Sequence, residues 1–445
     1  LAPLAGNITL RAWFREEDID ISTNTWVAAP SNDDWFDPLN WSLMVPPLPG
    51  QTVIIPAGQA LRLTNATPQL GRFELADGAT LTFEGWESAL QASDITIAGT
   101  VSHLPQTVTE PDPVTGEWVP QHRIWFKGSN LTVTASGSLD ADYKGYGLNA
   151  GPGRPPSGLY AGAGHGGIGG GGFGGQRHGP AYGEPDNPWQ PGSGGGASSS
   201  VRHGGGAIRI DLSGQQTVDG TITACGQDGG GTHIPSGSGG SIAIRCGTFQ
   251  GAPTGLICAD GGRGNYYSGN SAGGRIALHY NPVAQAELDN PRPPVRFSTY
   301  AWYYDVREIY DYPFKAEMGT LYLPDLLLLA ETPTSGALLN SQHFWYTRFY
   351  FPNDITSWSP DSLTISNCVV AFPEGFNLDV AEDLVLVGDE APFRGDSRTM
   401  RAGLRLYAAA TEDLYGARLT VGRDLNIVGD AWLLPHTQGY SSAIV

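Results

Sequence analysis

The sequence predicts an all-β protein built as a right-handed parallel β-helix, with long glycine-rich loops. Two observations carry this prediction: an abundance of glycine, and a strand motif that recurs at a fixed interval. Glycine accounts for 62 of the 445 residues, and each glycine inside a helix costs about 1 kcal/mol relative to alanine. Because 40% of the residues are hydrophobic, the chain is not disordered either.

The recurring motif is a hexamer of the form G-G-x-I-x-[IL], found at two equal intervals of 34 residues. Its copies are 205–210, 239–244 and 273–278. Alternating apolar residues indicate half-buried strands, and a fixed interval without intervening helices indicates one coil of chain per repeat. We therefore expect Ile208, Ile242 and Ile276 to stack in register inside the molecule, on strands about 4.8 Å apart.

A second strand motif lies between the hexamers and extends the pattern in both directions. It occurs at 220–224 and 255–259, with earlier relatives at 99–102 and 137–141, each of which follows an alternating strand, at 95–98 and 131–134. Three similar strands near the end of the chain are 361–365, 383–388 and 424–429. These segments predict further turns of the same β-helix with loops of different length.

The pattern divides the chain into six parts. We expect an N-terminal strand that acts as an assembly segment (1–24), opening rungs (25–149), a glycine-rich loop insertion (150–204), the 34-residue repeats (205–280), an aromatic-rich insertion (281–355) and C-terminal rungs (356–445). The glycine-rich loop has a high conformational entropy when free. It is therefore either mobile or held against the wall of the β-helix.

Charge and short motifs favour an extracellular or cell-surface location. A net charge of −19 excludes nucleic acid as a partner, since phosphate binding needs a basic face. No apolar stretch is long enough to span a membrane, and a start at Leu1 is what a mature secreted chain or a fragment would show. The N-glycosylation sequons begin at Asn7, Asn40, Asn65 and Asn130.

The four cysteines are Cys225, Cys246, Cys258 and Cys368. No C-x-x-C pair occurs, so no structural metal site is predicted. An even count permits disulfides outside the cell, but the spacing does not select a pairing, and buried thiols are the alternative. The acidic composition suggests Ca²⁺ as a cofactor, yet no loop carries the D-x-[DN]-x-[DN]-G pattern that would name its ligands.

Particular segments resemble known families. The runs 25–27, 35–42 and 49–58 (TWV, WFDPLNWS and PGQTVIIPAG) resemble the opening of bacterial β-solenoid adhesin-like proteins and of the glycine-rich domain of cell-surface hyaluronidases. The resemblance implies an opening rung plugged by tryptophans. The repeats at 237–242 and 272–276, with 319–323, look like a family of large glycine-rich secreted parallel β-helix surface proteins. No catalytic motif of a known β-helix enzyme accompanies them.

The candidate catalytic residues lie in the glycine-rich stretch: His165, His178, Tyr182, Asp186 and His203. The repeats add Asp228, His233 and Asp260. A His/Tyr pair is typical of the base and acid of β-elimination at a uronic acid. The alternative is that these side chains cap turns and bond exposed backbone.

Three candidates for glycan stacking are Trp189, Trp302 and Tyr304, the last two within the aromatic run 297–314. Aromatic faces pack on sugar rings, but the same run equally suits packing of an insertion or a subunit contact.

Three functions follow. The first is a structural or adhesive surface protein, such as a fibre or matrix subunit. The second is a polysaccharide lyase or hydrolase, and the third is a glycan-binding module that contacts extracellular polysaccharide. Convergence of His165, His178 and His203 would favour the enzyme. An open last rung would favour end-to-end self-association, with the strand-like segment 7–14 adding to a neighbour.

Overall fold

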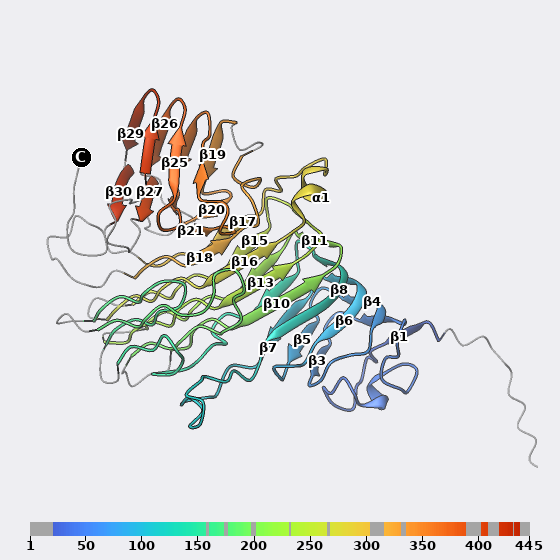
Figure 1. Ribbon diagram of the computed structural model, residues 1–445. Helices are drawn as coiled ribbons and strands as arrows, with labels where there is room; N and C mark the ends of the chain where they lie inside the picture. The colour runs from blue at the N-terminus through green and yellow to red at the C-terminus, as the bar shows by residue number, and fades with distance from the viewer. Residues whose placement is uncertain are drawn as a thin grey trace, which may run out of the picture.

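The computed structural model describes residues 21–156, 160–172, 177–196, 202–230, 233–264, 268–302, 316–330, 335–388, 402–407, 418–429 and 431–436. It is nearly all β, with 36% of the chain in strands and 2% in helices. Figure 1 shows the strands stacked one behind another along the molecule, from the N-terminal to the C-terminal part. Within these residues the helices are α1 (Pro282–Ala286) and a 3-10 turn at Pro38–Asn40.

The largest sheet has 15 strands. Its hydrogen-bonded order is β1 (Thr23–Thr25), β2 (Thr52–Ile55), β4 (Leu70–Leu75), β6 (Leu90–Ile97), β8 (Ile124–Val133), β10 (Ala207–Leu212), β13 (Ser241–Arg245), β16 (Arg275–His279), β18 (Thr320–Tyr322), β21 (Thr347–Tyr350), β24 (Val369–Ala371), β27 (Ala402–Tyr407) and β30 (Ala431–His436), with β11 (Gln215–Val218) joining β8 to β14 (Thr248–Gly251).

Three smaller sheets accompany it. The 8-stranded sheet runs β20 (Phe344–Trp345), β17 (Arg296–Ser298), β15 (Leu256–Cys258), β12 (Thr221–Thr223), β9 (Ser138–Asp140), β7 (Thr100–His103), β5 (Thr80–Phe83) and β3 (Ala60–Leu63). The others are β19 (Ala337–Asn340), β23 (Leu363–Ser366), β26 (Leu384–Gly388) and β29 (Leu425–Gly429), and β22 (Ser357–Trp358), β25 (Asn377–Val380) and β28 (Arg418–Val421). In the described part of the chain, all pairs between these strands are parallel.

The register of the 34-residue repeats confirms the prediction from their spacing. Ile208 pairs with Ile242, and Ile242 pairs with Ile276, in adjacent parallel strands. All three side chains are buried in one hydrophobic core. The second motif behaves in the same way, since Ile222 pairs with Ile257. Residues that are equally spaced in the sequence therefore occupy equivalent positions on successive strands.

The same register extends to the C-terminal strands. Ile365 pairs with Leu386, and Leu386 pairs with Ile427. Figure 1 shows this C-terminal group of strands standing at a steep angle to β10, β13 and β16. The range 281–355, expected as an insertion, supplies strands to both large sheets, beginning with β17 and β18.

Three tryptophans close the core at the N-terminal side. Trp26, Trp35 and Trp41 are fully buried, and their rings meet edge to face at centroid distances of 5.1 and 5.0 Å. The indole N–H of Trp41 donates to the carbonyl of Trp35 at 2.7 Å. Residues 1–20, including the expected assembly strand, lie outside the described residues, so strand addition by 7–14 stays a prediction.

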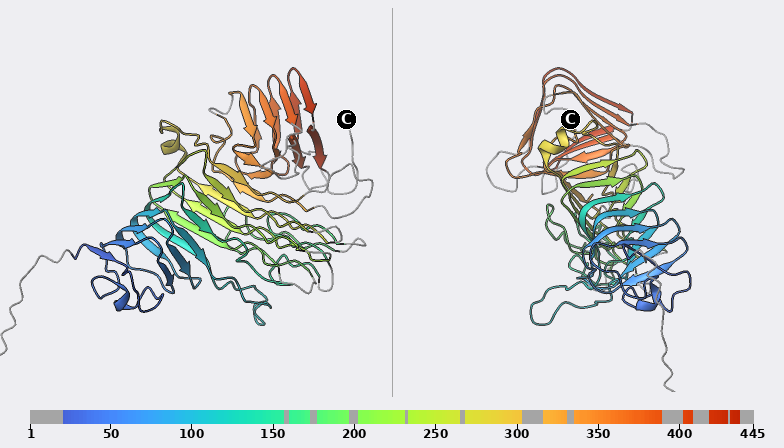
Figure 2. Two further views of the ribbon diagram at one scale, coloured as in Figure 1. Left: turned by 180° about the vertical axis from the view of Figure 1, so that it is seen from behind. Right: turned by 90° about the vertical axis from the view of Figure 1, so that its right-hand side faces the viewer.

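Glycine-rich segments pack into a bundle beside the large sheet, here called the glycine bundle. Its members are 141–153, 160–170, 177–183, 191–196, 202–206, 224–230, 233–240, 259–264 and 268–274. None of them contains a regular helix or strand. Figure 1 and the left view of Figure 2 show them running out from the ends of β10, β13 and β16 and lying side by side. The range 150–204, expected as a loop, contains three of them whole, 160–170, 177–183 and 191–196, and parts of 141–153 and 202–206.

The hydrogen bonds of the bundle repeat every three residues. In segment 233–240, the N–H of Gly237 donates to Gln227, that of Ser238 to Ser193 and that of Gly239 to Ala272. The N–H of Gly240 then returns to the first neighbour. Three directions in rotation are the geometry of a polyproline II helix, which has three residues per turn and no internal hydrogen bonds. Each segment therefore bonds neighbours on several sides, whereas a strand in a sheet bonds two.

Glycine is required for this packing because the backbones touch. A Cβ on Gly162 would lie 1.8 Å from the carbonyl oxygen of Asn270. The glycine-rich sequence is therefore a packing requirement of the bundle.

No helix in the described part of the chain is long and apolar enough to cross a membrane.

Candidate functional site

His165 and Tyr182, the predicted base and acid, lie side by side in the glycine bundle. Their rings stack with centroids 4.4 Å apart. Nδ1 of His165 lies 2.7 Å from the carbonyl oxygen of Gly239, and the hydroxyl of Tyr182 donates to the carbonyl of Pro191 at 2.6 Å. Both polar groups are therefore committed to backbone partners inside the bundle.

Burial fixes the protonation of this pair. His165 has no exposed surface, and this desolvation, together with the nearby charge of Arg275, lowers its pKa to about 3. Burial raises the pKa of Tyr182. A neutral imidazole donates through Nδ1 to Gly239 and has Nε2 at 3.5 Å from the hydroxyl of Ser241. Without access to solvent, His165 is unsuited to remove a proton from a polymer, and its contacts fit the alternative in which it bonds backbone.

Arg275, which was not among the residues selected from sequence, completes the arrangement. Its Nε donates to the carbonyl of Tyr182 at 2.8 Å, and its Nη2 donates to the carbonyl of His165 at 3.3 Å. Its side chain also reaches the hydroxyl of Thr320 at 3.2 Å. The signal was present in the third hexamer, which carries arginine where the others carry alanine and serine. Arg275 holds the bundle against β16 and β18.

The other bundle residues bond backbone as well. Oδ1 of Asp228 accepts from the N–H of Arg263 at 2.6 Å. Oδ1 of Asp260 accepts from the N–H of Tyr300 at 2.7 Å. The alternative interpretation, in which these carboxylates stabilise turns and exposed backbone, fits these contacts.

The remaining candidates are spread over different neighbours. His203 has Nδ1 at 3.2 Å from the carbonyl of Gly145. The backbone carbonyl of Asp186 lies 2.6 Å from Nε2 of His279. His233 adopts a positive φ of 63° and packs its ring 4.8 Å from Tyr160. The predicted residues do not converge on one exposed cleft.

His178 lines a cavity of about 970 Å³ at the outer part of the bundle. Glu110, Arg154 and Arg177 line the same cavity. Nη1 of Arg154 lies 3.5 Å from Glu110 and donates to the carbonyl of Asn149 at 3.2 Å. Two arginines and one histidine face one carboxylate, so the cavity suits an anionic ligand.

The predicted glycan platform in 297–314 is described only at its start. Trp302 packs 5.4 Å from Tyr300, with the guanidinium of Arg263 at 5.0 Å from its ring. It is therefore part of a packed aromatic cluster. Tyr304 lies outside the described residues.

The asparagines of the glycosylation sequons differ in their exposure to solvent. Asn40 is fully buried, its Nδ2 donates to the carbonyl of Asp34 at 2.8 Å, and its Oδ1 accepts from the N–H of Ser31 at 2.8 Å. Its side chain is therefore held inside the fold by these contacts. Asn65 and Asn130 are exposed. Asn7 lies outside the described residues.

Trp189, the third glycan candidate, belongs to a cluster that the sequence did not predict as a unit. We call it the Trp–Arg patch: Trp86, Arg123, Trp125, Lys127, Trp189 and Arg209. Trp189 is 41% exposed and meets Trp86 edge to face at 6.0 Å. The guanidinium of Arg123 lies 4.5 Å from the Trp86 ring and 3.8 Å from the Trp125 ring.

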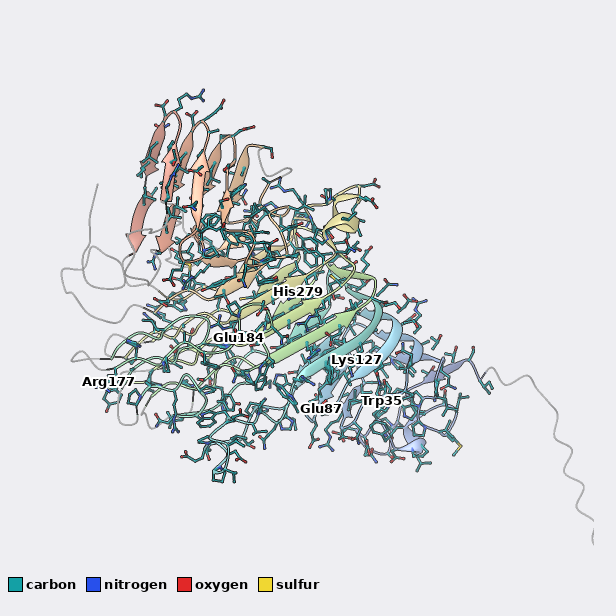
Figure 3. All side chains as sticks on the ribbon, viewed as in Figure 1. Trp35, Glu87, Lys127, Arg177, Glu184 and His279 are labelled. Atoms are coloured by element: carbon teal, nitrogen blue, oxygen red, sulfur yellow. The ribbon has the colours of Figure 1, made fainter. Side chains whose placement is uncertain are left out.

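Strand alternation places the centre of the patch on the outer face of the large sheet. In β8, Phe126 points into the core, so Trp125 and Lys127 point outward. Lys127 Nζ lies 3.6 Å from the Trp125 ring. Arg209 pairs with Trp125 in register, and its guanidinium lies 5.1 Å from the same ring. Figure 3 shows Lys127 and Glu87 on the side facing the viewer, with His279 farther along that face.

Two carboxylates fix the cations without neutralising them all. Asp211 accepts from the indole N–H of Trp125 at 2.8 Å and pairs with Arg209 at 2.6 Å. Glu87, which is largely exposed, lies 3.5 Å from Arg123. Desolvation, the largest cause, lowers the pKa of Arg123 to about 10, so it stays charged at neutral pH. Arg123 itself is buried under the two indoles, so the partly exposed cations of the patch are Lys127 and Arg209.

Metal-binding groups and similar proteins were the remaining possible sources of functional information. Over the described ranges, no group of three or more His, Cys, Asp or Glu side chains is placed to hold a metal ion. Comparison with family models, curated proteins and solved structures finds no match.

Proposed function

We propose that this protein is an extracellular adhesive protein, a surface or matrix subunit, that binds acidic polysaccharide through the Trp–Arg patch and catalyses no reaction. The observation that carries the proposal is the clustering of three tryptophans with the partly exposed cations Lys127 and Arg209 around the buried guanidinium of Arg123. The whole chain has only 25 lysines and arginines among 445 residues. Such a cluster in an acidic, lysine-poor protein indicates selection of an anionic ligand.

We also propose that the chain winds as a right-handed parallel β-helix. Support comes from the order of the two large sheets, in which each strand pairs with the strand one repeat further along. The column of isoleucines on β10, β13 and β16 supports it too, because a winding chain places equivalent residues directly above one another on successive turns. The hand follows from the strong preference of parallel crossovers for right-handed connections.

The chemistry of the patch fits an acidic sugar polymer. Apolar sugar faces pack on indole rings, which contribute a large contact area at a low entropic cost. Arginine pairs with carboxylates through two parallel hydrogen bonds, and Arg209 retains about a third of its side-chain exposure for this purpose. The space between segment 187–189 and the sheet is only about 10 Å³. An open platform of this kind suits a chain lying across it better than a small enclosed ligand.

A lyase or hydrolase is the second candidate, favoured by one observation. His178 shares its large cavity with Arg154, Arg177 and Glu110, and arginine next to histidine is suited to binding and deprotonating a uronic acid. Growth of unsaturated-product absorbance on polygalacturonate, lost in His178→Ala, would establish the enzyme. We expect no such product.

Binding is tested by calorimetric titration of the full chain with oligogalacturonate and with a neutral dextran oligomer. We expect binding of the acidic oligomer alone, weakened by salt because exposed charges are screened within about 10 Å at 0.1 M. Trp189→Ala and Arg209→Gln should each weaken binding about tenfold, equivalent to about 1.4 kcal/mol.

Arg72→Gln is the matched control. Arg72 lies on β4 of the same sheet with a half-exposed side chain and pairs with Glu74, but it does not belong to the patch. Its replacement should leave the affinity unchanged. Equal binding of both oligomers, binding of neither, or equal losses in Arg72→Gln and Arg209→Gln would each overturn the proposal.

A further inference from the structure

Two cysteines from neighbouring strands meet where the 8-stranded sheet passes into the glycine bundle. Cys258 is the last residue of β15, and Cys225 follows β12 by two residues. Thr223 of β12 pairs with Cys258 in register, and the N–H of Ala224 donates to the carbonyl of Cys258 at 2.8 Å. The two Sγ atoms lie 3.0 Å apart. That separation is shorter than an ordinary sulfur contact and about 1 Å longer than a disulfide bond.

The backbone on both sides of Cys225 is held in place. Its N–H donates to Oδ1 of Asp142 at 2.6 Å, and its carbonyl accepts from the N–H of Tyr143 at 3.0 Å. Cys258 is buried, whereas Cys225 is partly exposed. Closing the sulfur pair therefore needs only a small side-chain movement, and Cys225 is the less buried residue of the two.

We propose that Cys225 and Cys258 are a redox pair that closes a disulfide between neighbouring strands at the base of the glycine bundle. The oxidant is a small-molecule disulfide such as oxidised glutathione. The Cys225 thiolate attacks one sulfur of the oxidant, which forms a mixed disulfide and releases one thiol. The Cys258 thiolate then attacks Sγ of Cys225 and releases the second thiol. Two cysteine thiols lose two electrons, the oxidant gains them, and the two protons leave with its thiols.

The surroundings make the exchange slow and the product stabilising. The contact with Cys258, burial and the charges of Asp142 and Asp260 raise the pKa of Cys225, so the reactive thiolate is scarce at neutral pH. Once formed, the bond links two strands through a loop of more than thirty residues that includes the bundle residues 226–230 and 233–240. Cross-linking of this kind restricts the unfolded chain.

Cys246 and Cys368 serve as internal controls. Both are buried and lie against backbone carbonyls, Cys246 at 3.5 Å from that of His279 and Cys368 at 3.4 Å from that of Leu339. They have no sulfur partner in the described part of the protein. We expect them to remain thiols under conditions that oxidise the pair.

The test incubates the full chain with oxidised glutathione at pH 8, alkylates it in denaturant with iodoacetamide, and maps the peptides by mass spectrometry. We expect the Cys225 and Cys258 peptides joined, with Cys246 and Cys368 alkylated. In Cys258→Ala the reaction should stop at a glutathione adduct on Cys225, and in Cys246→Ala the link should form as in the parent chain. Oxidation should raise the thermal midpoint of the parent chain and leave that of Cys225→Ala unchanged.

Alkylation of both Cys225 and Cys258 after prolonged oxidation would overturn the proposal, as would a stable glutathione adduct on Cys225 of the parent chain. A link to Cys246 or Cys368 would do so as well. The peptide map of the parent chain decides the matter even where a variant fails to fold. Polysaccharide binding at the Trp–Arg patch is a separate measurement and does not depend on this outcome.

Discussion

At the scale of single residues, the same side chains can look catalytic in sequence and be structural in three dimensions. His165 stands among glycines, a setting that favours an exposed loop when only sequence is considered. In the folded chain it is enclosed by backbone and stacked on Tyr182. The sequence could not reveal this because the enclosing carbonyl belongs to Gly239, 74 residues away.

The first prediction concerns His165. Replacing it with alanine removes a buried hydrogen bond and leaves a void, so His165→Ala should lower the free energy of unfolding by about 2–4 kcal/mol. Urea denaturation followed by tryptophan fluorescence measures the change. His178→Ala, which alters a cavity wall, is the control and should shift the free energy by no more than about 0.5 kcal/mol. Equal losses in the two variants would contradict the structural role of His165.

The Trp–Arg patch shows a different limit of sequence analysis. Trp86, Trp125 and Trp189 lie far apart in the chain, and only Trp189 was selected from sequence. The alternation in β8 predicts that Trp125 points outward. The pairing that brings Arg209 next to it joins strands more than eighty residues apart, and no local pattern encodes that contact.

At the scale of elements, strands were predictable and the glycine bundle was not. Strands have a two-residue alternation of apolar side chains that burial makes necessary, so the columns at Ile208 and Ile222 followed from spacing alone. The bundle segments have a three-residue backbone rotation and few side chains to carry a pattern. Glycine abundance permitted either a mobile loop or a packed one, and the hydrogen bonds and backbone contacts of the folded chain show the packed one.

The second prediction tests the bundle through one glycine. A methyl group at Gly162 meets the carbonyl oxygen of Asn270 at 1.8 Å, and backbone cannot move aside as a side chain can. Gly162→Ala should therefore lower the free energy of unfolding by about 3 kcal/mol or more, measured by urea denaturation.

Gly336→Ala is the matched control for Gly162→Ala. Gly336 is exposed, and its added methyl group meets only the side-chain oxygen of Ser362, at 2.9 Å. Because that hydroxyl can rotate away, we expect a change within about 0.5 kcal/mol. A Gly162→Ala protein as stable as Gly336→Ala would show that the bundle is loosely packed.

At the scale of the whole molecule, buried histidines tie stability to pH. Burial lowers the pKa of both His103 and His165 to about 3. In His103, Nε2 accepts from the N–H of Ala207 at 3.2 Å, while Nδ1 lies 2.8 Å from the carbonyl of Leu104. The folded state needs both rings neutral. Asp142 acts in the opposite sense, because burial raises its pKa to about 6.

The third prediction follows from these signs. Unfolded histidines take up protons below about pH 6.5 while the folded ones resist until about pH 3, so their contribution to stability is complete above pH 6.5 and declines as the pH falls. From pH 7 to 5 the two histidines should cost about 4 kcal/mol, of which proton uptake by folded Asp142 restores about 1, for a net loss of about 2–3 kcal/mol. Urea denaturation at the two pH values measures this loss.

The Asp142→Asn variant lacks the group that restores stability, so its free energy of unfolding should fall by about 1 kcal/mol more between pH 7 and 5 than that of the parent chain. A free energy of unfolding that stays level or rises on acidification would mean that protons reach these rings in the folded protein.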